Sequence, residues 1–273
     1  MRPYDAYIFD LDGTLYLGEA LLPGARETVA ALRALGRRIV FLSNNPTRTR
    51  AQYAARLAAL GLAATEDEIV TSAMVMAAYL GRHRPGARVF VVGERPLKEE
   101  LRAAGLKLSQ RPGAIDVVVA SFDRTFTYRK LQIAFDAIRA GATLVATNPD
   151  RYCPVPGGGQ PDCAAITAAI EACTGVRAEV VAGKPSPVMI QTVLELLRLP
   201  PQRCIMTGDR LETDIAMGRA AEMATALVLT GATSRADLAG SALQPDYVLE
   251  RLDELLVACE GVASAGLLEP SGR

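Results

Sequence analysis

Short apolar runs alternate with segments of helical periodicity along most of this chain, and this alternation constrains the fold more than any other feature. The first run, residues 6–9 (Ala-Tyr-Ile-Phe), is too short and too rich in strand-forming residues for a helix, so we predict a buried strand. Residues 24–35 form a predicted helix that ends at Gly36, a typical helix C-terminal glycine. Residues 38–42 form the next predicted strand. A strand, a helix and a strand in this order indicate right-handed βαβ units, a parallel sheet and the α/β class.

The same alternation returns in the C-terminal third of the chain. Ser186-Pro187 predicts the start of a helix, because serine caps a helix and proline suits its first position. Ile190, Val193, Leu194 and Leu197 form the apolar stripe of that helix. The other expected elements are helices at 49–60 and 72–80 and strands at 178–182, 203–207, 224–229 and 246–249.

The middle of the chain, residues 82–178, has an alternation of its own. Strands are predicted at 88–92, 116–120 and 143–146, and helices at 96–104, 127–140 and 162–174, with a long loop over 148–161. We interpret this block as a second α/β domain inserted into a discontinuous core domain of residues 1–81 and 179–260, followed by a C-terminal tail at 261–273. The alternative is a single larger sheet.

Composition excludes several classes of protein. The 273 residues contain 30 Lys and Arg against 30 Asp and Glu, so the charge balance indicates neither a nucleic-acid partner nor a membrane surface. No apolar run approaches the ~18 residues of a membrane span. The N-terminal residues enter the first predicted strand without a signal-peptide pattern, which favours a cytoplasmic location.

Cysteine and histidine usage excludes further classes of site. The five cysteines are widely spaced and include no CxxC pair, which argues against a disulfide framework or a zinc site. The single histidine, His83, lies in a polar connector. A Ser-His-Asp triad or a histidine-rich metal site is therefore not expected.

Two acids follow the first predicted strand directly. Asp10 and Asp12 lie one residue apart, and Gly13 allows the backbone to turn tightly after them. Ligands of open parallel sheets bind at the carboxyl ends of the strands. Two acids at such a place repel each other unless a cation or a shared proton compensates for the repulsion. In the alternative interpretation, Asp12 caps a helix and Asp10 is solvated.

Polar residues also follow three other predicted strands. These are Ser43 and Asn44 after 38–42, Lys184 after 178–182, and Asp209 with Asp214 after 203–207. In one parallel sheet, all these strand ends open toward the same edge. Oxygen ligands without histidine or cysteine favour Mg²⁺, and one lysine with small hydrogen-bonding groups suits a phosphate. The sequence therefore predicts a site for a divalent cation and a phosphate.

The order of these motifs resembles a known family. DxDGT at 10–14, Ser-Asn at 43–44, Gly-Lys-Pro at 183–185 and GDxxxTD at 208–214 together resemble the signature of haloacid dehalogenase-type phosphatases. Residues 41–45 and 208–214 are similar to the NagD/p-nitrophenylphosphatase branch, subfamily IIA. The resemblance implies a Rossmann-like core with an α/β cap domain inserted between the second and third motifs. It also implies a homodimer formed through the cap.

The resemblance also implies roles for single residues. Asp10 would be the nucleophile and a metal ligand, and Asp12 the acid and base, with its backbone carbonyl on the metal. Lys184 would bind the phosphate and orient Asp10. Ser43, Asn44 and Asn45 would bind phosphate. Asp209 would ligate Mg²⁺, with Asp214 as a direct or water-mediated ligand.

The expected reaction is hydrolysis of a small phosphorylated metabolite, such as a sugar, polyol, glycolate or pyridoxal phosphate, through an aspartyl-phosphate. Substrate choice would depend on the cap, where Asp162 either contacts substrate or only caps the following helix; we favour the helix cap. The alternatives are a phosphomutase, a dehalogenase, against which Asp12 argues, and a non-enzymatic protein that binds phosphorylated metabolites.

Overall fold

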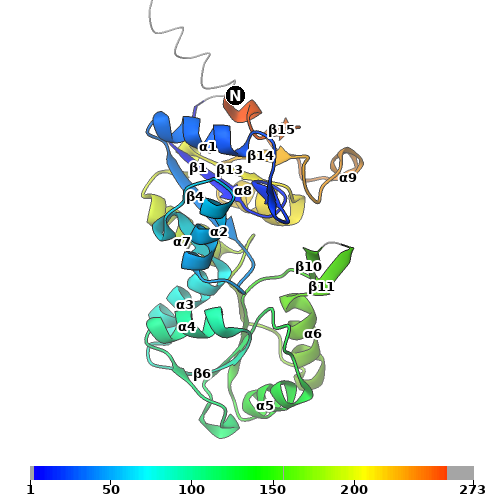
Figure 1. Ribbon diagram of the computed structural model, residues 1–273. Helices are drawn as coiled ribbons and strands as arrows, with labels where there is room; N and C mark the ends of the chain where they lie inside the picture. Colours follow the sequence, from blue (N-terminus) through cyan, green and yellow to red (C-terminus); the bar gives the residue numbers. More distant parts are fainter. Residues whose placement is uncertain (1–2, 156, 257–273) are drawn as a thin grey trace, which may run out of the picture. The chain divides into compact units, whose positions relative to one another are not determined.

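The computed structural model describes residues 3–155 and 157–256 and has the predicted α/β architecture (Figure 1). The predicted tail at 261–273 and Cys259 lie outside the described residues. The chain divides into two compact units. Unit 1 contains the described residues of Met1–Leu42, Leu57–Ala64 and Leu194–Arg273, and unit 2 those of Ser43–Arg56 and Thr65–Val193.

A six-stranded sheet carries the first and last predicted strands of the chain. Its order is β15-β14-β13-β1-β4-β5. The pairings from β15 through β4 are parallel. All five residues of β1 are buried, as expected for a central strand of a parallel sheet. The strands are β1 (Ala6–Asp10), β4 (Arg38–Ser43), β5 (Ile69–Thr71), β13 (Cys204–Gly208), β14 (Ala224–Val228) and β15 (Tyr247–Leu249).

The helices of unit 1 follow the local signals in the sequence. Helix α1 (Ala25–Ala34) ends as predicted, because Gly36 takes a positive φ of 67° and its N–H bonds to the carbonyl of Arg33 at 2.9 Å. The remaining elements of unit 1 are the hairpin β2 (Tyr16–Leu17) and β3 (Ala20–Leu21), the 3₁₀ turn η3 (Pro201–Arg203), the π-helical turn η4 (Leu211–Ile215), α8 (Ala216–Ala220) and α9 (Arg235–Gly240).

Two helices have residues in both units: α2 (Arg50–Ala59) and α7 (Pro187–Leu197). The start of α7 is as predicted. Pro187 is its first residue, and the Ser186 hydroxyl accepts hydrogen bonds from the N–H groups of Val188 and Met189 at 3.2 and 3.5 Å.

A second, five-stranded sheet lies within unit 2. Its order is β12-β9-β8-β6-β7, and every pairing is parallel. Its strands are β6 (Arg88–Val92), β7 (Lys107–Leu108), β8 (Val117–Ala120), β9 (Thr143–Ala146) and β12 (Val180–Val181). Helices α5 (Tyr128–Arg139) and α6 (Cys163–Thr174) lie side by side and share a core with β6, β8 and β9 (Figure 1). Unit 2 also contains η1 (Glu66–Glu68), α3 (Ser72–His83), α4 (Arg95–Ala103) and η2 (Pro112–Ala114).

The structure corrects two predictions. The strand before Lys184, predicted at 178–182, is only Val180–Val181, and it pairs with β9 in the five-stranded sheet. The expectation that Lys184 follows a strand of the same sheet as Asp10 is therefore wrong: an apolar run indicates a strand but not its pairing partner. The predicted loop 148–161 also contains an antiparallel hairpin, β10 (Tyr152–Val155) and β11 (Gly158–Pro161).

The two separate parallel sheets agree with a core domain plus a cap domain and exclude the single larger sheet. The predicted limits of the inserted domain, 82 and 178, stay predictions. Over the described ranges, no helix combines the length and the apolar character needed to cross a membrane. No disulfide joins the four cysteines within those ranges.

Candidate functional site

Three predicted acids of unit 1 come together. Asp10 is the last residue of β1, and Asp209 follows the neighbouring strand β13. Because Phe9 pairs with Thr207 in parallel register, both strands end at the same edge of the sheet. Asp214 lies in the π-helical turn η4, five positions after Asp209. One carboxylate oxygen from each acid lies within 4.8 Å of the others, and all three residues are buried. We name these three residues the carboxylate cluster.

Backbone N–H groups orient two of the three carboxylates. The N–H of Ala232 donates to Oδ2 of Asp209 at 2.7 Å, and the N–H of Arg210 donates to Oδ2 of Asp214 at 3.1 Å. The second bond spans four positions within one turn, so the GDxxxTD motif itself positions Asp214. The first links Asp209 to the segment after β14, which sequence analysis did not single out.

Glycines make room for these carboxylates. A Cβ at Gly231 would overlap the Asp209 carboxylate, and a Cβ at Gly208 would overlap the Asp214 carboxyl group. At Gly13, where φ is +89°, a Cβ would lie 2.5 Å from Oδ2 of Asp209. These three glycines therefore leave the space that the Asp209 and Asp214 carboxylates occupy.

The carboxylate cluster suits a divalent cation. Two carboxylate charges no more than 4.8 Å apart repel each other by at least about 3 kcal/mol at an effective dielectric near 20. A bound cation would offset this repulsion for all three pairs. Three buried oxygen donors without nitrogen or sulfur match the ligand set of Mg²⁺ or Ca²⁺. The donor set therefore fits the metal that the sequence predicts.

Asp12 is not one of the three acids of the carboxylate cluster. Its side chain is exposed, and its Oδ2 accepts a hydrogen bond from the Tyr16 hydroxyl at 3.3 Å. An isolated bridge also pairs the backbones of Asp12 and Tyr16. Asp10 and Asp12 thus have different environments: one carboxylate is buried among acids, and the other is open to solvent. This difference excludes the interpretation in which Asp10 is the solvated residue.

In unit 2, the structure brings together Asn44 and Lys184, which are 140 positions apart. Oδ1 of Asn44 accepts from the Lys184 N–H at 2.7 Å, and Nδ2 donates to the Lys184 carbonyl at 3.2 Å. The hydroxyl of Ser72 and the side-chain amide of Asn148 donate to the Asn44 carbonyl at 2.5 and 2.7 Å. We name Asn44, Ser72, Asn148 and Lys184 the amide cluster; all four residues are buried.

The amide cluster fixes the backbone of Lys184 through the Asn44 side chain, an arrangement that sequence analysis did not predict. Gly183 allows it, because a Cβ there would lie 2.7 Å from Oδ1 of Asn44. Sequence analysis also missed Ser72 and the structural role of Asn148. One signal was present: Asn148 follows the end of β9 closely, as Asn44 follows β4.

The neighbouring predicted residues are also hydrogen bonded. The hydroxyls of Ser43 and Tyr53 lie 3.2 Å apart, and the Asn45 N–H donates to Oγ of Ser43 at 3.2 Å. Oδ1 of Asn45 accepts from the N–H and the hydroxyl of Thr47 at 3.0 and 2.7 Å. Nδ2 of Asn45 lies 3.7 Å from Sγ of Cys153 in β10, so the hairpin touches this segment within unit 2.

Asp162 caps helix α6, as we favoured from the sequence. It is buried, and its Oδ1 accepts from the Cys163 N–H at 2.5 Å. Two other charged residues of unit 2 are paired. Asp123 contacts Lys130 at 2.5 Å, and Arg124 donates to both carboxylate oxygens of Glu94 at 2.7 and 2.6 Å. Hydrogen bonds from Arg124 hold the pKa of Glu94 below its usual range.

Comparison with known proteins places the chain in a family. Residues 7–107 match the family described as haloacid dehalogenase-like hydrolase, and residues 181–255 match a related hydrolase family. The sugar-phosphatase AraL of Bacillus subtilis is 39% identical over 256 residues, which cover 93% of each chain.

Solved structures agree with the sequence matches. The 4-nitrophenylphosphatase of Thermotoga maritima has a TM-score of 0.90 and 37% identity, covering 93% of this chain and 97% of its own. A glycerol phosphate phosphatase of Mycobacterium tuberculosis, solved in complex with magnesium, has a TM-score of 0.86 and 35% identity, covering 92% of this chain and 76% of its own. With its buried aspartates, two parallel sheets and matches over nearly its whole length, this chain belongs to the haloacid dehalogenase-like hydrolases, in the branch of NagD and the p-nitrophenylphosphatases.

Proposed function

We propose that this protein is a Mg²⁺-dependent phosphatase that hydrolyses small phosphorylated metabolites through an aspartyl-phosphate. The observation that carries the proposal is the carboxylate cluster. In it, one carboxylate oxygen each of Asp10, Asp209 and Asp214 lie within 4.8 Å of one another. Relatives named as sugar phosphatases and as a glycerol phosphate phosphatase support sugar or polyol phosphates as the substrate class. Glycolate and pyridoxal phosphates are also expected from the sequence, and the experiment described below includes them as substrates.

Asp10, Asp209 and Asp214 are the residues that would hold the metal. Bound Mg²⁺ would neutralise the repulsion between the carboxylates and the phosphate, which is about 4 kcal/mol for unit charges 4 Å apart at an effective dielectric near 20. The magnesium in the structure of the mycobacterial relative supports the choice of metal. The backbone carbonyl of Asp12 is proposed as a further ligand.

The chemistry divides into two displacements at phosphorus. A carboxylate oxygen of Asp10 attacks the phosphorus, the bond to the ester oxygen breaks, and Asp12 gives its proton to the leaving alcohol. Asp12, now ionised, takes a proton from water as the water oxygen attacks the phosphorus. The bond to Asp10 breaks and inorganic phosphate leaves. The exposure of Asp12 supports this role, because an exposed carboxyl group is accessible both to the leaving alcohol and to the attacking water.

Lys184 is proposed to bind the phosphate charge, with Ser43, Asn44 and Asn45 donating hydrogen bonds. The order of the four sequence motifs supports these roles. The Asn44 side-chain amide already bonds to the Lys184 backbone, so we assign the phosphate contact of Asn44 to its backbone N–H. Asp162, whose side chain accepts the N–H of Cys163, is proposed as a helix cap rather than a substrate contact.

The test measures release of inorganic phosphate from p-nitrophenyl phosphate and from a set of sugar, polyol, glycolate and pyridoxal phosphates. We expect activity with Mg²⁺, loss of activity with EDTA and a loss of at least about 1,000-fold in Asp10→Asn. Glu212→Gln is the matched control, because Glu212 is an exposed acid in the same motif as Asp214. Unchanged turnover in Asp10→Asn would contradict the proposal.

Two further measurements separate the alternatives. Asp12→Asn should accumulate an acid-stable, hydroxylamine-sensitive phosphoenzyme when the leaving group needs no protonation, because the second step lacks its base. A phosphomutase would isomerise a sugar phosphate without releasing phosphate, and a binding protein would retain the ligand without turnover.

The cellular location and the oligomeric state of the protein are proposals as well. The absence of a disulfide among the four cysteines of the described ranges supports a cytoplasmic location. We propose a homodimer formed through the cap, on the family resemblance alone. Sedimentation at micromolar concentration tests it, and a monomer under these conditions would contradict it.

A further inference from the structure

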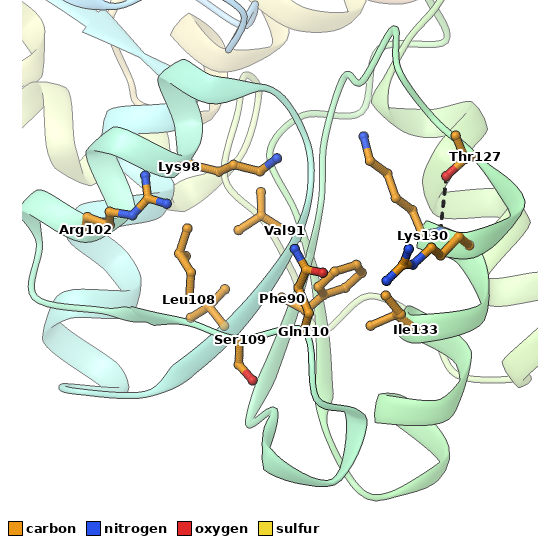
Figure 2. A pocket seen from close by; sticks show the side chains of 12 residues that line it. Phe90, Val91, Lys98, Arg102, Leu108, Ser109, Gln110, Thr127, Lys130 and Ile133 are labelled. Carbon is orange, nitrogen blue, oxygen red and sulfur yellow. Dashed lines mark hydrogen bonds between the residues drawn. The ribbon is translucent and has the colours of Figure 1, made fainter.

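A groove in unit 2 involves none of the residues proposed for catalysis. It has a volume of about 590 Å³ and is formed by β6, α4, α5 and the segment that follows β7 (Figure 2). This volume is in the range of small-molecule sites, roughly 300–1,000 Å³. The lining residues are Val89, Phe90, Val91, Lys98, Arg102, Leu108, Ser109, Gln110, Thr127, Arg129, Lys130 and Ile133.

The ionisable side chains that line the groove are all cations. Lys98 and Arg102 come from α4, and Arg129 and Lys130 come from α5. Figure 2 shows the Lys98 and Lys130 side chains reaching toward each other from the two sides of β6. No aspartate or glutamate is among the lining residues. Four positive charges therefore surround one space.

Little of this charge is compensated. Lys130 pairs with Asp123 at 2.5 Å and also donates to the Thr125 hydroxyl at 2.7 Å. Within the described part of the chain, no ion pair joins Lys98, Arg102 or Arg129 to a carboxylate. The net charge of the groove is thus positive even after the Asp123 contact is counted.

The neighbouring cations contribute, after burial, to a lowered pKa of Lys98. Burial lowers the pKa of its amine, and the charges of Lys130 and Arg102 lower it further, against the opposing effects of Asp123 and Glu94. A negative charge placed among these cations would remove part of that repulsion. The groove therefore has the space for an anion and a positive charge that an anion would neutralise.

We propose that this groove binds an anion of the phosphate class that carries two or more negative charges. The cations supply the attraction, and Ser109 and Gln110 supply neutral hydrogen-bonding groups. Phe90, Leu108 and Ile133 form an apolar part of the lining that can contact the carbon skeleton of an organic phosphate. The proposal is independent of the phosphatase activity.

The test uses isothermal titration calorimetry with pyrophosphate as the probe, in EDTA and at low ionic strength, so that no metal takes part. We expect Lys98→Gln to weaken binding at least ten-fold and Lys98→Arg to retain it. Arg139→Gln is the matched control, because it removes the same charge from an exposed position at the end of α5. Raising the salt from 50 to 500 mM should also weaken binding at least ten-fold, since screening acts on charge pairs.

Arg102→Gln provides a second variant at an exposed position, in case Lys98→Gln disturbs the fold. Thermal unfolding of each variant checks this point. The proposal is overturned if Lys98→Gln and Arg102→Gln bind pyrophosphate as the unmodified protein does. It is also overturned if Arg139→Gln weakens binding as much as they do, or if millimolar pyrophosphate does not bind. In the last case, a macromolecular partner would be the remaining candidate for this surface.

Discussion

Replacement of Asn44 by alanine tests how the backbone of Lys184 is held. The change removes the acceptor at 2.7 Å and the donor at 3.2 Å that the side chain offers to the Lys184 backbone. The bonds from Ser72 and Asn148 go to the Asn44 carbonyl, so they do not depend on the side chain that is removed. The variant therefore isolates one pair of hydrogen bonds.

The expected loss follows from burial. Lys184 is only 3% exposed, so its N–H and carbonyl would both lose a partner in a site with little access to water. A buried polar group without a partner costs about 1–3 kcal/mol, and two such groups with partial relaxation give about 2–4 kcal/mol. For a unit of this size, that loss lowers the melting temperature by about 4–16 °C.

Calorimetry measures the melting temperature, and phosphate release measures activity, which should fall because Lys184 is no longer fixed. Asn44→Asp should lose at least as much stability, since it keeps an acceptor for the Lys184 N–H but turns a buried, charged oxygen toward the Lys184 carbonyl. Gln132→Ala, which removes an exposed amide bonded to Asp136, should stay within about 0.5 kcal/mol of the unmodified protein. A melting temperature of Asn44→Ala within 1 °C of the unmodified protein would refute the reasoning.

Three further changes test other parts of the structure. Gly231→Ala should weaken Mg²⁺ binding at least about ten-fold, because its Cβ would displace the Asp209 carboxylate. Gly240→Ala is the control and should not weaken binding, because a Cβ there meets open space. If calorimetry gives the two variants equal Mg²⁺ affinities, the carboxylate cluster is excluded as the metal site. Asp162→Ala should cost about 1 kcal/mol of stability in urea unfolding, whereas Asp162→Asn, which still caps α6, should cost less; equal losses would argue against the cap. The pKa of Glu94 is depressed in the fold, so its stabilising effect is complete above the ordinary value of 4.5 and is lost as the pH falls through the lower folded value. The difference in melting temperature between Glu94→Gln and the unmodified protein should therefore shrink as the pH falls below 4.5, and a difference constant with pH would contradict this.

The sequence by itself determined the α/β class and the features that depend on neighbouring residues. Hydrophobic runs located β1 and β13, and the acids that follow them proved to be the carboxylate cluster. The cap at Asp162 and the C-terminal glycine of α1 were also predictable, because both are hydrogen-bonding patterns that span only a few positions.

The tertiary structure decided everything that depends on pairing between distant segments. It placed β12 beside β9 rather than in the sheet of Asp10, formed a hairpin in the predicted loop, and joined Asn44 to Lys184 over 140 positions. It also brought Gly231 against Asp209. The physical reason is that periodicity records which face of a segment is buried, whereas the partner of that face depends on how whole elements pack. The sequence thus identified the three acids that come together in the carboxylate cluster, and packing set the contacts that hold them.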